Sequence, residues 1–256
     1  MKFGKRLIEV LILLAALCLI APAAQAADVS IGGGIGFKPD YEGSEDYEAV
    51  PVPFANVNID NGMFVRLLGL NLRANLIPSK MWYLGPVYNY RPERDDVDNS
   101  AVDDMKKVSD ANELGVFGGF NIDNWVLSLE FLADMGEAHD GWYSKLRGGY
   151  NWVINKSWVL SMGAFTTYAD EDYMQTYFGV SRQDAARSGL DRYNADSGIK
   201  DVGIDLGLNW MITESWSTRG IFQYTQLVGD ADDGSPVVDE GSEGQLFGAV
   251  LVVYTF

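Results

Sequence analysis

The sequence predicts an all-β fold, an antiparallel transmembrane β-barrel of about twelve strands with short turns at one end and long loops at the other. Three observations lead to this prediction. Many segments of strand length alternate apolar and polar residues, the links between them alternate in length, and tryptophans gather beside the short links. A soluble sandwich would also alternate, but the position of the tryptophans is typical of the interface between membrane and water.

The N-terminal segment is predicted to be a signal peptide of residues 1–26. A positive region precedes an apolar run at 7–20, and small residues at 21–26 suit a signal peptidase that cleaves after Ala26. The alternative is an N-terminal membrane anchor, for which the apolar run is short. Cys18, the single cysteine, lies in this segment, so no disulfide or thiolate metal site is expected in the mature chain.

The composition suits one β domain at 27–256. The chain has 28 Gly, 7 Trp, 13 Tyr and 12 Phe, and no later segment could form a membrane helix. The net charge of −17 argues against nucleic acid as a partner, because phosphates would be repelled. An acidic surface could instead hold divalent cations or repel anions from a pore, although solubility of the long loops explains it as well.

The alternation of side chains places the strands in order along the chain. The expected strands are 28–37, 49–59, 62–68, 69–77, 81–91, 112–121, 125–135, 141–153, 157–169, 199–211, 215–227 and 245–256. The pair at 62–77 requires a bend near Gly69, and without that pair the barrel has ten strands. The last strand presents a continuous apolar face and ends in Tyr254 and Phe256. Such an ending is typical of bacterial outer-membrane barrels, whose assembly machinery reads it as a signal.

The links indicate which end of the barrel faces which compartment. The short, turn-rich links are Asn61-Gly62, Pro78–Lys80, Asp123-Asn124, Asn155-Lys156 and Thr213–Ser215. The long acidic links are 38–48, 92–111, 170–198 and 228–244. We expect the short links and both termini in the periplasm and the long links outside the cell. The longest link, 170–198, contains residues 183–188, which could form one or two helical turns, and would lie as a solvated or functional segment over the barrel mouth.

Charged residues on the inward face of the strands are the candidate site. The predicted lumen-lining residues are Glu130, Asp134, Lys145, Arg147, Asp201, Asp205 and Arg219. They would either line a selective pore or form a salt-bridged plug, since small barrels fill their interior with side chains. The sequence leaves these two alternatives open.

The sequence predicts no catalytic residue, metal ligand or cofactor site. His139 is the single histidine, which excludes a histidine metal cluster. With Ser144 it could form the Ser–His pair of an outer-membrane hydrolase, but no third member is recognisable. Asp230–Gly234 is acidic enough to attract calcium or bridge to lipopolysaccharide, yet its spacing does not fit an EF-hand loop. We therefore expect a protein that is not an enzyme.

Several motifs together resemble the MipA/OmpV family of outer-membrane proteins. They comprise Gly34-Ile-Gly36, Tyr41–Ser44, Pro51-Val-Pro53, Tyr177–Val180, Ala185, Ser188–Leu190, Tyr193, Gly198, Asp201, Leu227–Ala231, Ser235–Val238 and Tyr254–Phe256. The similarity spans the mature chain, and Gly234 is an extra residue before the Ser-Pro pair.

This resemblance implies an outer-membrane barrel that acts as a scaffold between a lytic murein transglycosylase and a peptidoglycan synthase in cell-wall remodelling. Its other partners would be outer-membrane lipids, lipopolysaccharide and the barrel-assembly machinery. Such a scaffold would use the periplasmic turns, although their shortness makes a large docking surface difficult to build. The second hypothesis is a porin-like channel for small solutes.

Overall fold

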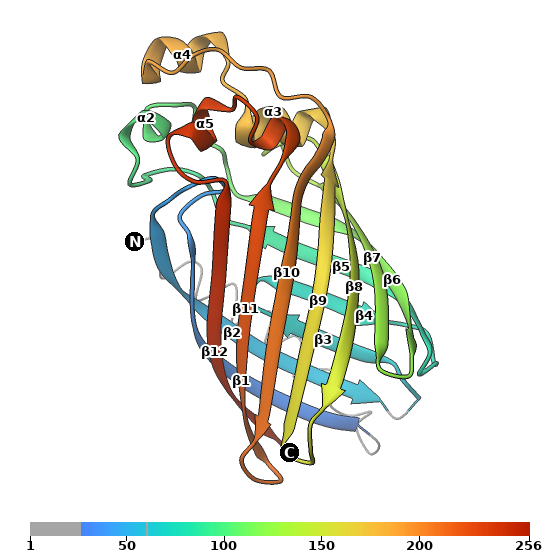
Figure 1. Cartoon of the computed structure of the whole chain (residues 1–256). Helices are drawn as coiled ribbons and strands as arrows, with labels where there is room; N and C mark the ends of the chain where they lie inside the picture. Colours follow the sequence, from blue (N-terminus) through green and yellow to red (C-terminus); the bar gives the residue numbers. More distant parts are fainter. Residues whose placement is uncertain (1–26, 60) are drawn as a thin grey trace.

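The computed structural model describes residues 27–59 and 61–256, which form a closed antiparallel barrel (Figure 1). Each strand pairs with its neighbours in the sequence, and the first strand pairs with the last to close the sheet. The predicted barrel of twelve strands is therefore confirmed, and the alternative of ten is wrong. The predicted signal peptide, 1–26, lies outside the described residues, so its cleavage stays a prediction.

The strands of the described residues follow the order expected from the sequence. They are β1 Ala27–Pro39, β2 Tyr47–Ile59, β3 Phe64–Leu68, β4 Asn71–Asn75, β5 Trp82–Arg91, β6 Ala111–Ile122, β7 Trp125–Asp134, β8 Trp142–Val153, β9 Trp158–Ala169, β10 Gly198–Met211, β11 Trp216–Leu227 and β12 Gly244–Thr255.

The helices lie in the links at one end of the barrel (Figure 1). They are α2 Ser100–Asp103, α3 Glu171–Phe178, α4 Arg182–Ser188, the 3₁₀ turn η2 Gly229–Ala231 and α5 Pro236–Asp239. No helix within residues 27–59 and 61–256 has the length and apolar character to cross a membrane. The long links thus share one end of the barrel and the short turns the other, as predicted. We call these ends the loop end and the turn end.

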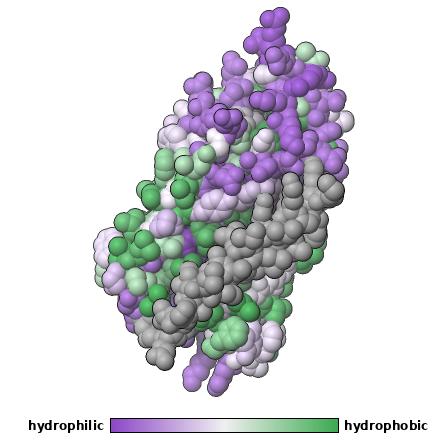
Figure 2. All heavy atoms as spheres, turned by 180° about the vertical axis from the view of Figure 1, so that it is seen from behind, coloured by the Kyte–Doolittle hydropathy of each residue, from purple (hydrophilic) through white to green (hydrophobic). Residues whose placement is uncertain are grey.

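Side chains on the outer face of the strands form an apolar belt. On β10, Ile204, Leu206 and Leu208 are between 39% and 50% exposed, while the residues between them turn inward. Figure 2 shows apolar residues over the wall of the barrel and hydrophilic residues over the loop end. Such a belt would be unfavourable in water, so its natural surroundings are lipid.

Tryptophans mark the boundary of this belt at the turn end. Trp125, Trp158 and Trp216 each begin a strand directly after a short turn. The rings of Trp158 and Trp210 stack with centroids 5.2 Å apart, and Trp216 packs edge-on against Tyr254. Aromatic rings at this height are typical of the boundary between lipid and water.

Glycines allow β1 and β12 to pair closely at the seam of the barrel. Gly34 pairs with Leu251, and a Cβ atom at Gly34 would collide with the carbonyl oxygen of Val250. A larger residue would push the two strands apart where the first and last strands must meet.

The wall is incomplete beside β2, because the β3–β4 hairpin is short. β2 pairs with β1 along its whole length but with β3 only over Phe54–Asn58. The carbonyl of Pro53 accepts the Gly69 N–H. Every second residue of β2, counted from Pro53, therefore directs its backbone C=O and any N–H towards the side of the hairpin. Above it, the edge of β2 carries Pro51, which has no N–H to offer.

Candidate functional site: a capped lumen

The lumen contains a cavity of about 740 Å³ near the loop end, which we call the outer cavity. Its lining includes residues of β4, β5, β8, β9, β10 and β11 together with the link between β1 and β2. Glu48 on the unpaired stretch of β2 and Asn71 at the tip of the β3–β4 hairpin both line it. The cavity is therefore bounded by charged strand residues and by the links folded over the mouth.

Helix α3 forms a cap that is packed into the mouth rather than exposed to solvent. Asp170 caps its first turn by accepting the Tyr173 N–H, and Tyr173, Met174 and Phe178 are fully buried. Ser235 donates a 2.8 Å hydrogen bond to the carbonyl of Phe178. The aromatic residues of α3 thus supply the apolar core of the cap, and the link at 170–197 is not merely a solvated cover.

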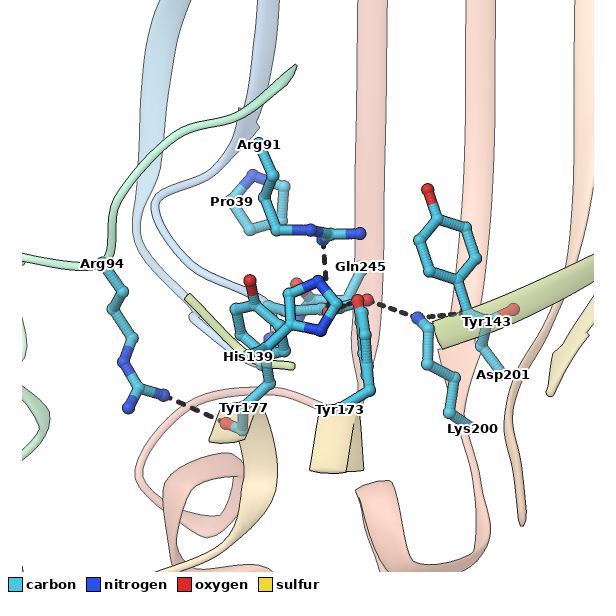
Figure 3. Close-up of polar contacts among 12 residues, drawn as sticks. Pro39, Arg91, Arg94, His139, Tyr143, Tyr173, Tyr177, Lys200, Asp201 and Gln245 are labelled. Carbon is cyan, nitrogen blue, oxygen red and sulfur yellow. Dashed lines mark hydrogen bonds and ion pairs between the residues drawn. The ribbon is translucent and has the colours of Figure 1, made fainter. Parts of the chain in front are cut away.

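Glu113 is the centre of a buried polar cluster beneath the cap, and Figure 3 shows Arg91, His139 and Tyr143 of this cluster. Its carboxylate accepts hydrogen bonds from Arg91 Nε at 2.7 Å, Asn89 Nδ2 at 2.7 Å and the Tyr143 hydroxyl at 3.0 Å. His139 Nε2 lies 3.3 Å from the same carboxylate. The Nδ1 atom of His139 accepts the Gly141 N–H, so the proton of a neutral ring is on Nε2 and points to Glu113.

Aromatic rings of the cap surround the guanidinium of Arg91. The carbon Cζ of Arg91 lies 5.1 Å from the ring of Tyr173, 5.2 Å from Tyr177 and 5.6 Å from Tyr143. Cations are attracted to the faces of such rings, most strongly where water is excluded. Arg91 therefore connects the strand β5 to the cap by charge and by ring contacts at once.

A second ionic contact ties the β1–β2 link to the cap. Glu42 forms an ion pair with Lys200 and accepts a 2.7 Å hydrogen bond from the Tyr173 hydroxyl. Burial alone would raise the pKa of Glu42, but the positive charges of Lys200 and Arg91 outweigh it, and the pKa lies below its usual value. The carboxylate is therefore charged when it holds the cap.

The predicted lumen-lining residues of β7, β8 and β10 are brought together as pairs. Arg147 and Asp205 form a double contact with distances of 2.8 and 2.5 Å, and Arg73 reaches Glu130 at 2.9 Å. A Cβ atom at Gly163 would collide with the Arg147 guanidinium, so this glycine makes room for the pair.

The other predicted residues have different surroundings. Lys145 Nζ lies 3.6 Å from the centroid of Phe165, and Arg219 contacts Asn209 at 3.2 Å. Asp201 pairs with its neighbour Lys200 at 2.6 Å. Asp134 is at the end of β7, where its carboxylate accepts hydrogen bonds from the backbone N–H groups of Gly136, Ala138, His139 and Asp140. That position makes Asp134 a stabiliser of the 135–141 link.

His139 and Ser144 do not form the Ser–His pair that was considered. His139 is buried beneath the cap, whereas Ser144 pairs with Phe131 and Tyr168, which are on the outer face. Within the described part of the chain, no group of three or more His, Cys, Asp or Glu side chains could hold a metal ion. In Asp230–Gly234, Asp230 instead accepts the backbone N–H of Asp196.

A closed barrel with an apolar belt and a capped lumen defines the class of this molecule as a membrane β-barrel. A family model described as "MltA-interacting protein MipA" matches residues 31–256, and the chain belongs to this MipA family. The proteins named "MltA-interacting protein" from Escherichia coli (strain K12) and Shigella flexneri are each 27% identical to it, over 91% of this chain and 94% of theirs. Among solved structures, the translocator domain of the autotransporter NalP from Neisseria meningitidis matches with a TM-score of 0.45 at 11% identity, covering 100% of this chain and 97% of that one.

Proposed function

We propose that this protein is a non-enzymatic barrel of the outer membrane that binds a lytic murein transglycosylase and links it to a peptidoglycan synthase. Membership of the MipA family and the name of the two relatives, MltA-interacting protein, support the first partner. The synthase is part of the proposal through the family resemblance described above.

The observation that carries this proposal is the obstructed lumen. Paired side chains, above all Arg147–Asp205 and Arg73–Glu130, extend into the interior, and α3 is packed into the mouth. A lumen occupied in this way favours work at the rim of the barrel over passage through it.

The turn end is the surface that we propose for docking. The turn at 154–157 joins β8 to β9, and the turn at 212–215 joins β10 to β11. The stacked rings of Trp158 and Trp210 lie beside both turns. A stable interface needs on the order of 800 Å² per partner, so several turns must contribute together. Glu214 is an exposed charge on this surface, and Asp110 is an exposed charge at the loop end.

Capture of a purified MltA-type transglycosylase by the barrel in nanodiscs tests the proposal. We expect saturable binding, weakened at least threefold by Glu214→Arg and unchanged by the matched Asp110→Arg variant. A peptidoglycan synthase should join only when the transglycosylase is present. Binding no stronger than to an unrelated twelve-stranded barrel would refute the docking function.

The proposed location is the outer membrane, supported by the apolar belt and its tryptophans. The proposal includes export through a signal peptide of residues 1–26, assembly through Tyr254 and Phe256, and contact with lipopolysaccharide at the loop end. Mass spectrometry of the protein in outer-membrane fractions should find Ala27 as the new N-terminal residue. An intact Met1 in the membrane fraction would contradict the export part.

The outer cavity favours a second candidate, a channel for small solutes. Planar-bilayer measurements test it, because Arg147→Ala or Asp205→Ala should change ion selectivity if these residues border an open path. We expect the wild-type barrel to be closed. Steady conductance that responds to either substitution would make the channel the better assignment.

A further inference from the structure

Among the described residues, three buried side chains that line the outer cavity each have a polar atom without a hydrogen-bond partner: Tyr41, Tyr177 and Asp201. Asp201 is 3% exposed and Tyr177 is 6% exposed, yet Asp201 Oδ1 and the Tyr177 hydroxyl make no hydrogen bond within the described residues. Both residues line the outer cavity. Buried polar groups are almost always paired, so unpaired ones beside a cavity indicate that something else occupies the space.

Lys145 presents an unpaired positive charge to the same cavity. Its ammonium contacts the face of Phe165, and among the described residues no carboxylate oxygen lies within 4.0 Å of it, although the charge of Asp201 attracts it from further away. The nearby carboxylates of Glu130 and Asp205 are engaged by Arg73 and Arg147. Arg66 and Arg219 also lack an ion pair within the described part of the chain, but they contact the side-chain oxygens of Asn56 and Asn209 and lie outside the lining of the outer cavity.

Asp201 is the negative counterpart of this mismatch. Its Oδ2 atom accepts the Lys200 ammonium at 2.6 Å, while Oδ1 remains without a donor. Lys200 is in turn shared with Glu42, so its charge is divided between two carboxylates. The cavity thus offers one free cationic donor and one free anionic acceptor.

We propose that the outer cavity binds a small zwitterion, an amino acid or short peptide. Its ammonium group donates to Asp201 Oδ1, and its carboxylate accepts from Lys145 Nζ. The volume of about 740 Å³ is in the range of small-molecule sites and exceeds that of a single amino acid. A ligand without charges would leave the Lys145 ammonium without a contacting anion and Asp201 Oδ1 without a charged donor, whereas a zwitterion supplies both together.

The gap above the β3–β4 hairpin offers this ligand a route that leaves the cap in place. Glu48 on the unpaired stretch of β2 and Asn71 at the tip of the hairpin both line the cavity, so the cavity reaches this part of the wall. The proposed site is at the loop end, away from the turns proposed for docking, so the two proposals stand or fall separately.

Calorimetric titration of the full-chain barrel in detergent with the dipeptide alanyl-alanine tests the inference. We expect one saturable site, and at least tenfold weaker binding of the same dipeptide with an acetylated amino end and an amidated carboxyl end. Lys145→Met and Asp201→Asn should each weaken alanyl-alanine binding at least tenfold. Arg219→Met, which removes a lumenal cation outside the cavity lining, should leave it unchanged.

A variant at an uncharged position of the cavity distinguishes loss of binding from loss of folding. Gln223→Trp places a large ring in the cavity from β11 and should abolish binding while the barrel keeps its β-sheet circular dichroism. Equal affinity for the blocked dipeptide would show a neutral site and overturn the proposal. Absence of binding to the folded wild-type barrel would overturn it too, leaving water as the occupant.

Discussion

Replacing Glu113 by alanine removes one acceptor shared by four side chains beneath the cap. Arg91, Asn89, Tyr143 and His139 all lose their contact with it, and Arg91 keeps only the more distant Glu42 at 3.7 Å. Breaking a buried ion pair on one side costs about 3–5 kcal/mol. We expect a loss of about 4 kcal/mol, because Glu42 compensates only part of it.

This loss should be local to the cap, so amide hydrogen exchange is the appropriate assay. A loss of about 4 kcal/mol corresponds to roughly thousandfold faster exchange of the α3 amides, which report opening of that helix. Amides in the middle of β9 and β10 should change little. Glu113→Gln keeps one acceptor oxygen and should lose about half as much.

Protection of α3 in Glu113→Ala within threefold of the wild type would refute this reasoning. Equal losses in the alanine and glutamine variants would show that the charge of Glu113, and not the number of its hydrogen bonds, holds the cap.

Three further predictions concern the cap and the lumen. The pKa of Glu42 is lowered in the folded protein, so the stability that its charge gives the cap is present above about pH 4.5 and is lost as the pH falls through the lowered pKa. Amide hydrogen exchange in α3 should therefore accelerate in acid. The Glu42→Gln variant should lose that pH dependence, and an unchanged profile would contradict the assignment. A double-mutant cycle of Arg147→Met and Asp205→Asn, followed by urea unfolding in vesicles, should give a coupling of about 1–2 kcal/mol, and additive effects would show that the pair contributes nothing. Gly141→Ala should destabilise the cap by about 2 kcal/mol, because its Cβ would collide with the carboxylate that caps α3, whereas Gly220→Ala, with open space around it, should have little effect.

The barrel could be predicted from the sequence because its determinants are local. Alternation along each strand defines inward and outward faces, and the short turns carry residues such as Gly62 and Asp123 that adopt positive φ. The hairpin of β3 and β4 followed from the need for an even number of strands and a bend near Gly69, which has a φ of 58°. The helical turns expected at 183–188 correspond to α4.

The cap could not be predicted, because its determinants are distant in the sequence. Helix α3 is only 8 residues long and rich in aromatic side chains, so burial rather than intrinsic propensity stabilises it. Glu113 alternates inward like any other strand residue, and its partners come from three separate segments: β5, the 135–141 link and β8. The spacing of Tyr173 and Tyr177, on one face of a helix, was the available local signal.

The unpaired stretch of β2 has a consequence for the behaviour of the protein in a crowded membrane. An unpaired strand edge can form backbone hydrogen bonds with a strand of a neighbouring chain, which is the usual first step of edge-to-edge aggregation. Pro51 withholds a donor on that side, and Pro53 withholds another beside the tip of the hairpin. The two prolines thus make this stretch of β2 a poor template for another strand.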